Sequence, residues 1–197
     1  LVHAGLVDLQ ILQTTDVHGY ILDEDERGSG GWLRLATLIE ERREELGPTG
    51  TLLIDCGDTI QGSPLASASR GQVCVALLKA LAYDVWVPGN HELDFGVRRC
   101  VELCGQLPGR TLCGNLRMTV DGATVQLPAW QVFERAGARV AVLGAHARPL
   151  KQWLWGDALR AFQIAPALSL LPRVLPDLPP TRPAMVTLAL HPGWLEH

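Results

Sequence analysis

The chain has 197 residues, of which 47% are hydrophobic and 19% charged, and its formal net charge is −4. This length suits one domain with a sizeable core. Neither half of the sequence carries a basic stripe, so the electrostatic signature of a protein that binds nucleic-acid polymers is absent. No apolar run approaches the roughly 18 residues of a membrane span. The five cysteines contain no Cys-x2-Cys pair, so a thiolate metal site is not expected. We therefore expect a globular domain without a membrane span and without a nucleic-acid polymer as partner.

The first predicted strand covers residues 7–15 and runs into Asp16-Val17-His18-Gly19. Side chains two residues apart in extended backbone point the same way, so Asp16 and His18 can reach one metal ion. A carboxylate with an imidazole suits Mn, Zn, Fe or Co. For a single Asp-x-His pair, a polar turn that binds no metal is the stronger alternative.

Two helices are predicted on either side of the second strand. Apolar residues recur at helical spacing from Trp32 onward, and Gly47-Pro48 ends this helix. Ser63-Pro64 has the pattern of an N-cap followed by proline in the first turn. It predicts a helix over residues 65–82, which Gly71 is able to divide in two.

The second strand is predicted from the continuous apolar run Leu52-Leu53-Ile54, a pattern typical of a strand covered on both faces. Two acidic residues follow it, Asp55 and Asp58. Either could bind a metal, and we favour Asp58 because it lies beyond Gly57, in the loop.

The third strand, Val85-Trp86-Val87, leads into Gly89-Asn90-His91-Glu92-Leu93-Asp94. Asp94 follows His91 by three residues, so the two side chains meet if a helix begins here. A carboxylate bonded to an imidazole fixes its tautomer and raises its basicity. We therefore expect His91 to be an oriented acid or electrophile and Asn90 to be a neutral oxygen ligand. A polar turn without chemistry is the alternative.

The second half of the chain contains further apolar runs and one hairpin signal. Strands are expected at residues 111–113, 130–134, 139–143 and 185–190. Prolines make a long helix unfavourable after Ala167. A lone histidine is more often a structural hydrogen-bonding residue than a ligand, so we assign His146 that role. His191 differs because it directly follows the last strand.

Candidate ligands thus follow four separate apolar strands. They are Asp16 with His18, Asp58, Asn90, and His191. Chance can place one or two such residues at strand ends, but the carboxyl ends of parallel strands meet at one edge of an α/β fold, where ligands bind. The combination therefore predicts a site for two metal ions.

These residues resemble the motifs of the calcineurin-like metallophosphoesterases. The similar motifs are Asp16-x-His18, Gly57-Asp58-x-x-x-Gly62, Gly89-Asn90-His91-Glu92 with Asp94, and His191-x-Gly193. Within that superfamily the chain is most similar to the 5′-nucleotidases and the 2′,3′-cyclic-nucleotide phosphodiesterase/3′-nucleotidases. Supporting segments are Gln61-Gly62-Ser63-Pro64-Leu65 and Gly114-Asn115-Leu116, and the resemblance covers about residues 9–194.

The resemblance implies two divalent cations, which could be Mn, Zn, Co or Fe. It places Asp16 and His18 on the first cation and Asn90 and His191 on the second, with Asp58 bridging both. Two such cations activate a water molecule and stabilise an in-line displacement at phosphorus.

The same resemblance implies an α/β fold of two packed sheets with helices outside, formed by residues 1–194 as a catalytic domain that is incomplete at its C-terminus. The substrate would be a small-molecule nucleotide. His91, supported by Asp94, would stabilise the transferring phosphoryl group, and Asn115 would bind substrate. Secreted or periplasmic placement follows from the resemblance alone.

Several departures from the family pattern weaken the expectation of activity for this chain alone. The family has a later Gly-His-x-His motif and a C-terminal domain that holds the nucleoside base, and the sequence ends before both. Leu190 stands where the family usually has Ser, and residues 195–197 resemble the start of an expression tag. We therefore expect weak or absent turnover by this chain alone. The alternative function is a non-catalytic nucleotide- or metal-binding domain with a degenerate site.

Overall fold

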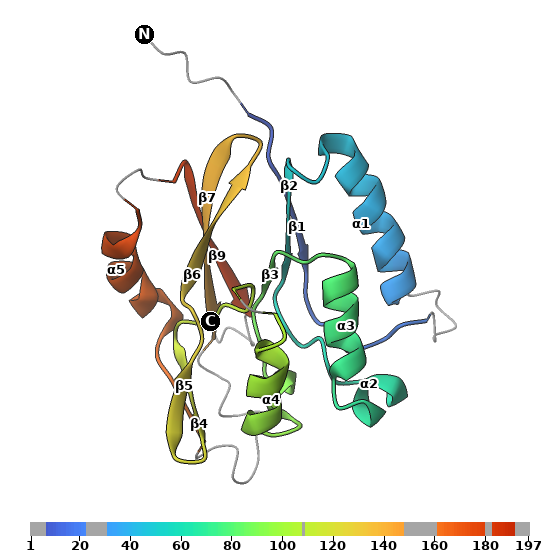
Figure 1. Ribbon diagram of the computed structural model, residues 1–197, viewed down its shortest axis with the longest axis vertical. Coiled ribbons are helices and arrows are strands. Elements are labelled where there is room, and N and C mark those ends of the chain that lie inside the picture. Colours follow the sequence, from blue (N-terminus) through green and yellow to red (C-terminus); the bar gives the residue numbers. More distant parts are fainter. Residues whose placement is uncertain (1–6, 23–30, 108, 148–160, 180–182, 192–197) are drawn as a thin grey trace, which may run out of the picture.

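The computed structural model describes residues 7–22, 31–107, 109–147, 161–179 and 183–191. The expectations for residues 192–197, among them Gly193 and the tag-like terminal residues, lie outside this part of the chain. Helices α1 and α3 lie on one side of the sheets and α5 lies on the other (Figure 1). Within the described residues, no helix is both long enough and apolar enough to cross a membrane.

The first sheet is parallel, in the order β1-β2-β3. Its strands are β1 (Gln10–Thr14), β2 (Thr51–Asp55) and β3 (Val85–Trp86). All five residues of β2 are buried, so the strand predicted to be covered on both faces is confirmed. Leu53 faces a core shared with the helices, whereas Leu52 and Ile54 face the second sheet. This alternation follows from the pleat of a strand.

Four helices accompany the first sheet: α1 (Trp32–Leu46), α2 (Pro64–Ala68), α3 (Gln72–Ala80) and α4 (Val97–Cys104). Trp32, Leu78 and Leu103 pack with Leu53 in one core cluster. Gly71 separates α2 from α3, as the sequence allowed. Its φ is +80°, in the left-handed region, and an added Cβ would lie 2.8 Å from the side chain of Ile60.

The second sheet packs against the first. It has the order β6-β7-β9 and consists of β6 (Trp130–Arg135), β7 (Ala138–His146) and β9 (Met185–His191). The hairpin predicted around residues 136–138 is present as the antiparallel pair β6–β7, and β9 joins β7 in parallel. Val140 and Val142 of β7 meet Leu52 and Ile54 of β2 in the core between the sheets.

Short helical segments cover the outer face of the second sheet. They are η4 (Ala167–Leu170), α5 (Leu171–Val174) and η5 (Leu175–Asp177). Leu170 and Val174 pack on Leu143 and Ala145 of β7. Prolines interrupt this region, as the sequence indicated, so no long helix forms. The layers confirm the predicted α/β fold of two packed sheets with helices outside.

A third sheet was not predicted. It is antiparallel in the order β5-β4-β8 and consists of β4 (Leu116–Val120), β5 (Ala123–Gln126) and β8 (Phe162–Ile164). The strand expected at residues 111–113 is wrong: Thr111 makes one isolated bridge to Trp86. Beyond it the chain leaves the first sheet, because the amide of Cys113 donates to Pro128 and that of Gly114 to Gly144.

Candidate metal centre

The loops that leave β1 and β2 hold the first candidate ligands in unusual backbone conformations. Asp16, His18 and Asp58 have φ values of 55°, 50° and 54°. Positive φ is uncommon for residues other than glycine, and it persists where the surrounding structure imposes it, often at functional sites. Backbone contacts impose it here, since the amide of His18 donates to the carbonyl of Asp58 at 2.9 Å.

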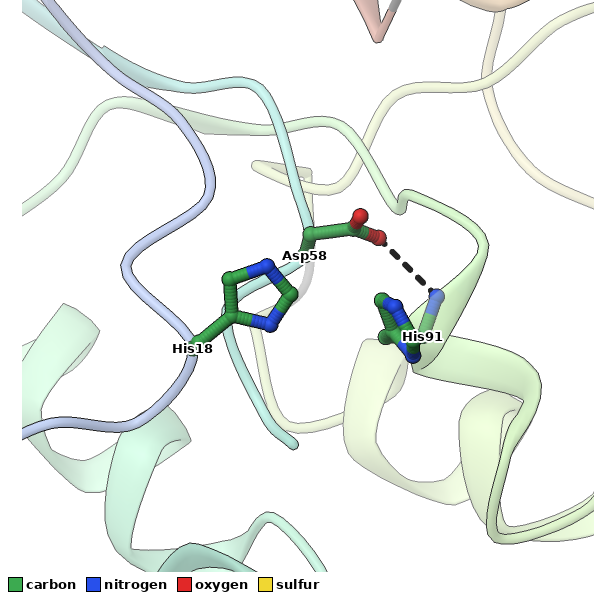
Figure 2. Close-up of side chains that lie close together, drawn as sticks. All are labelled: His18, Asp58 and His91. Atoms are coloured by element: carbon green, nitrogen blue, oxygen red, sulfur yellow. Dashed lines mark hydrogen bonds between the residues drawn. The ribbon is translucent and has the colours of Figure 1, made fainter. Parts of the chain in front are cut away.

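Two groups of side chains place their ligand atoms within 4.8 Å of one another. The first consists of His18, Asp58 and His91, and the second of Asp16, Asp58 and His191. Figure 2 shows the first group, in which three separate loops bring the side chains together around the Asp58 carboxylate. Because Asp58 belongs to both groups, the arrangement suits two neighbouring cations that share one carboxylate. The division of the other ligands between the two cations stays a prediction.

His191 brings an imidazole nitrogen to the second group. Its Nδ1 lies 2.6 Å from the carbonyl of Cys56, which can only accept, so Nδ1 carries the proton. Its Nε2 then faces Asn90 Oδ1 at 3.2 Å and Asp58 Oδ2 at 3.4 Å. Burial opposes protonation of this ring, but the contact with Asp58 outweighs it and raises the pKa of His191 to about 9. A cation therefore has to displace a proton from His191.

His18 and His91 are oriented in the same manner. His18 Nδ1 lies 3.0 Å from the carbonyl of Gln61, and His91 Nδ1 lies 2.6 Å from Asp94 Oδ2. A short helical turn, η1 (His91–Leu93), provides the spacing that the sequence suggested for His91 and Asp94. The hydrogen bond to Asp94 raises the pKa of His91. Each ring therefore leaves its Nε2 available to the site.

Asp58 is held from both sides. The amide of His91 donates to its Oδ1 at 2.9 Å, and His191 faces its Oδ2. Burial alone would raise the pKa of Asp58, but these contacts outweigh burial and lower it. Asp58 is thus a carboxylate at neutral pH, the form that binds cations.

Asp55, the competing candidate, belongs to neither group. It is fully buried and accepts hydrogen bonds from the Thr14 hydroxyl at 2.6 Å, the Gly57 amide at 3.1 Å and the Thr59 hydroxyl. Burial raises the pKa of Asp55 to about 6. Asp58 rather than Asp55 belongs to the two groups of ligand atoms, and its role as a metal ligand stays a prediction.

Glu92 is a residue whose contribution the sequence did not reveal. Its carboxylate is fully buried and accepts hydrogen bonds from four backbone amides. The donors are Gly89 at 2.5 Å, Thr59 at 2.8 Å, Asp58 at 2.9 Å and Ile60 at 3.2 Å. These bonds fasten the loop that carries Asp58 to the loop that carries Asn90 and His91. Burial raises the pKa of Glu92 to about 7, against the opposing effect of the amides.

Asn115 directly precedes β4 and is buried beside His146, the last residue of β7. Its Nδ2 donates to the carbonyls of His146 at 2.7 Å and Ala165 at 2.8 Å, and its Oδ1 accepts from the amide of His146 at 2.9 Å. These contacts give Asn115 a structural function, and its predicted contact with substrate stays a prediction.

The fold and the donor set together define an α/β protein with two packed sheets and a candidate metal centre built from loops at the strand ends. The family model of the calcineurin-like phosphoesterases matches residues 9–169. The chain belongs to this family.

Known proteins similar to this chain include two nucleotide hydrolases. A 2′,3′-cyclic-nucleotide 2′-phosphodiesterase/3′-nucleotidase from Haemophilus influenzae is 36% identical over 104 residues, which cover 46% of this chain and 16% of that protein. Human 5′-nucleotidase is 36% identical over 109 residues, 50% of this chain and 18% of that protein. The matches therefore span less than a fifth of either relative.

Among solved structures, the calcineurin-like phosphoesterase YfkN from Bacillus subtilis is similar with a TM-score of 0.78 and 22% sequence identity. The similarity covers 96% of this chain and 63% of that one. At this identity the comparison supports the fold.

Proposed function

We propose that the protein hydrolyses phosphoesters of nucleotides with two divalent cations, as a 5′-nucleotidase or a 2′,3′-cyclic-nucleotide 2′-phosphodiesterase/3′-nucleotidase. The observation that carries this proposal is the membership of Asp58 in two adjacent donor groups. Two cations that share a carboxylate can stabilise the attacking and the leaving oxygen of one displacement. The names of the two relatives support nucleotides as the substrate class.

The donor set fits divalent metals of the Mn, Zn, Co and Fe group. Asp16 and Asp58 offer carboxylates, Asn90 a neutral amide oxygen, and His18 and His191 imidazole nitrogens. Both histidines turn Nδ1 to a backbone carbonyl, which is the usual outer contact of a metal-binding histidine. When bound, the cations supply Lewis-acid charge and activate water.

His91 belongs to the first donor group, but we propose that its ring acts on the substrate and that Asp16, His18 and Asp58 hold the first cation. Its ring lies 5.1 Å from that of His18, centroid to centroid, and Asp94 accepts from Nδ1, which leaves Nε2 for the site. The hydrogen bond to Asp94 raises the pKa of His91 and so favours the protonated ring, in which Nε2–H is a hydrogen-bond donor. Such a donor, fixed before the reaction, stabilises the charge that develops on phosphoryl oxygens.

The proposal extends to the whole protein in the way the family resemblance implies. Residues 1–194 form part of a catalytic domain, with further ligands and a nucleoside-binding domain supplied by additional sequence, and the protein acts in the periplasm or outside the cell. Fractionation of cells that express the natural gene tests the compartment, and recovery with cytosolic markers would contradict it.

The test of function is phosphate release by the full-length protein from AMP, 3′-AMP and 2′,3′-cyclic AMP, with Mn²⁺, Co²⁺ or Zn²⁺ and with EDTA. We expect release that depends on the metal and that falls strongly in the His91→Asn variant. Binding of these nucleotides without turnover, under all metals, would contradict the proposal and favour a binding domain with a degenerate site.

A further inference from the structure

His146 is the last residue of β7, and its strand partner across the sheet is His191 of β9. Both are buried, with 1% and 3% of their surfaces exposed. Residues paired in register on neighbouring strands point to the same face, and the two rings are 5.0 Å apart between centroids and inclined by 40°. His146 therefore lies directly beside a candidate metal ligand.

The position of His146 is fixed by its backbone. Asn115 accepts from its amide and donates to its carbonyl, at 2.9 Å and 2.7 Å. The ring is also oriented, because Nδ1 lies 2.7 Å from the carbonyl of Ala147. A carbonyl only accepts, so Nδ1 carries the proton and Nε2 carries a lone pair.

The Nε2 atom of His146 is buried and has no hydrogen-bond partner among the described residues. The same holds for the indole nitrogens of Trp32 and Trp86, which are donors in the helix-side core. His146 differs from the two tryptophans because its unpaired atom, Nε2, is an acceptor and because the residue lies beside the candidate metal centre. Leaving a buried polar atom without a partner costs about 1–3 kcal/mol, so a functional explanation is called for.

We propose that His146 is a positioning residue of the metal centre, whose Nε2 accepts a hydrogen bond from an O–H group bound there. The group is a water molecule or a hydroxyl of the substrate. Direct ligation is less consistent with the geometry, since His146 is in neither of the two groups with ligand atoms within 4.8 Å. If the O–H group belongs to the substrate, the inference rests on the proposed function. If the group is a water molecule bound at the metal centre, it does not.

The test compares His146→Leu, which removes the acceptor, with His146→Gln, which retains one, in the full-length protein. Three quantities are measured: Mn²⁺ affinity by titration calorimetry without substrate, KM and kcat, and the Tm of the metal-free protein. The loss of an outer contact at a metal site typically lowers affinity or activity 10–100-fold. We expect a loss of about this size in Mn²⁺ affinity or in KM for Leu and substantial recovery for Gln, whereas any fall in the metal-free Tm of the Leu variant would report the lost Nδ1–H donor to Ala147.

The two sources of the O–H group give different results. If the donor is water, His146→Leu weakens Mn²⁺ binding in the absence of substrate. If it is a substrate hydroxyl, Mn²⁺ affinity is unchanged and KM rises for nucleotides but not for p-nitrophenyl phosphate, which has no hydroxyl.

A merely structural histidine would give another pattern. In that case Leu would lower the metal-free Tm and leave Mn²⁺ affinity and KM unchanged, and this result would overturn the proposal, as would a Leu variant identical to wild type in all three quantities. Failure of the proposed function is recognised separately, because wild-type protein would then bind Mn²⁺ without releasing phosphate.

Discussion

Replacement of Glu92 by Gln is expected to destabilise the protein and to disorganise the metal centre together. Oε1 of Glu92 accepts from Thr59 and Ile60, and Oε2 accepts from Asp58 and Gly89. Glutamine has the same shape but only one acceptor oxygen. Whichever way its amide turns, an NH₂ group faces two backbone N–H donors.

The expected magnitude follows from those two amides. Each buried donor left unpaired costs about 1–3 kcal/mol, so the substitution should cost about 2–6 kcal/mol of unfolding free energy. For a protein of this size, 1 kcal/mol corresponds to a Tm shift of about 2–4 °C. Removal of the charge offsets part of this cost, because burial raises the pKa of Glu92 to about 7 and so opposes the ionised form. We therefore expect the net loss at the lower end, about 4 °C in Tm at pH 8.

The matched control is Glu102→Gln. Glu102 lies on α4, and its exposed carboxylate pairs with Arg99 at 3.2 Å. Such surface pairs contribute little, so this change should stay within about 0.5 kcal/mol. The assay is urea unfolding of both variants beside Mn²⁺ titration. A Glu92→Gln variant as stable as the control, with unchanged Mn²⁺ affinity, would refute the conclusion that this carboxylate holds the two loops of the metal centre together.

Three further predictions concern the oriented histidines and one glycine. Asp94→Asn should lower the pKa of His91, seen by NMR titration, and reduce kcat about 10–100-fold; an unchanged pKa would contradict the contact. Because the pKa of His191 is raised from 6.5 to about 9, its stabilising effect on the metal-free protein is complete below pH 6.5 and is lost as pH rises through 9. Between these values Mn²⁺ affinity should rise about tenfold per pH unit, and calorimetry that shows no proton release would contradict this. Gly57→Ala should destabilise the protein by at least about 1 kcal/mol more than Gly137→Ala in urea unfolding. Both have positive φ, but only at Gly57 would a Cβ meet a backbone nitrogen, at 2.3 Å, and equal losses would argue against this close approach.

The sequence was informative where long-range packing leaves a local pattern. The apolar run at residues 52–54 predicted a strand buried on both faces, because only such a strand lacks a polar face. The same strand predictions place Asp58 and His191 at one edge of the fold, since residues just beyond buried parallel strands reach the same rim. Gly71 signalled its helix break because a left-handed residue cannot continue a helix.

Other features had no local signal. The third sheet is built from strands of three to five residues, and β5 is largely exposed, so its apolar periodicity is weak. The burial of Glu92 depends on amides more than 30 residues away in the chain. The sequence alone indicates an ordinary structural histidine at His146, because only the pairing of β7 with β9 brings His191 beside it.

The central claim, that Asp58 serves two cations, is tested most directly by metal stoichiometry. Full-length wild-type protein and its Asp58→Asn variant would be loaded with Mn²⁺ and measured by elemental analysis, with circular dichroism to confirm that both are folded. We expect two ions per chain in the wild type and loss of tight binding at both positions in the variant. A folded variant that still holds two ions, or a wild type that holds none, would contradict it.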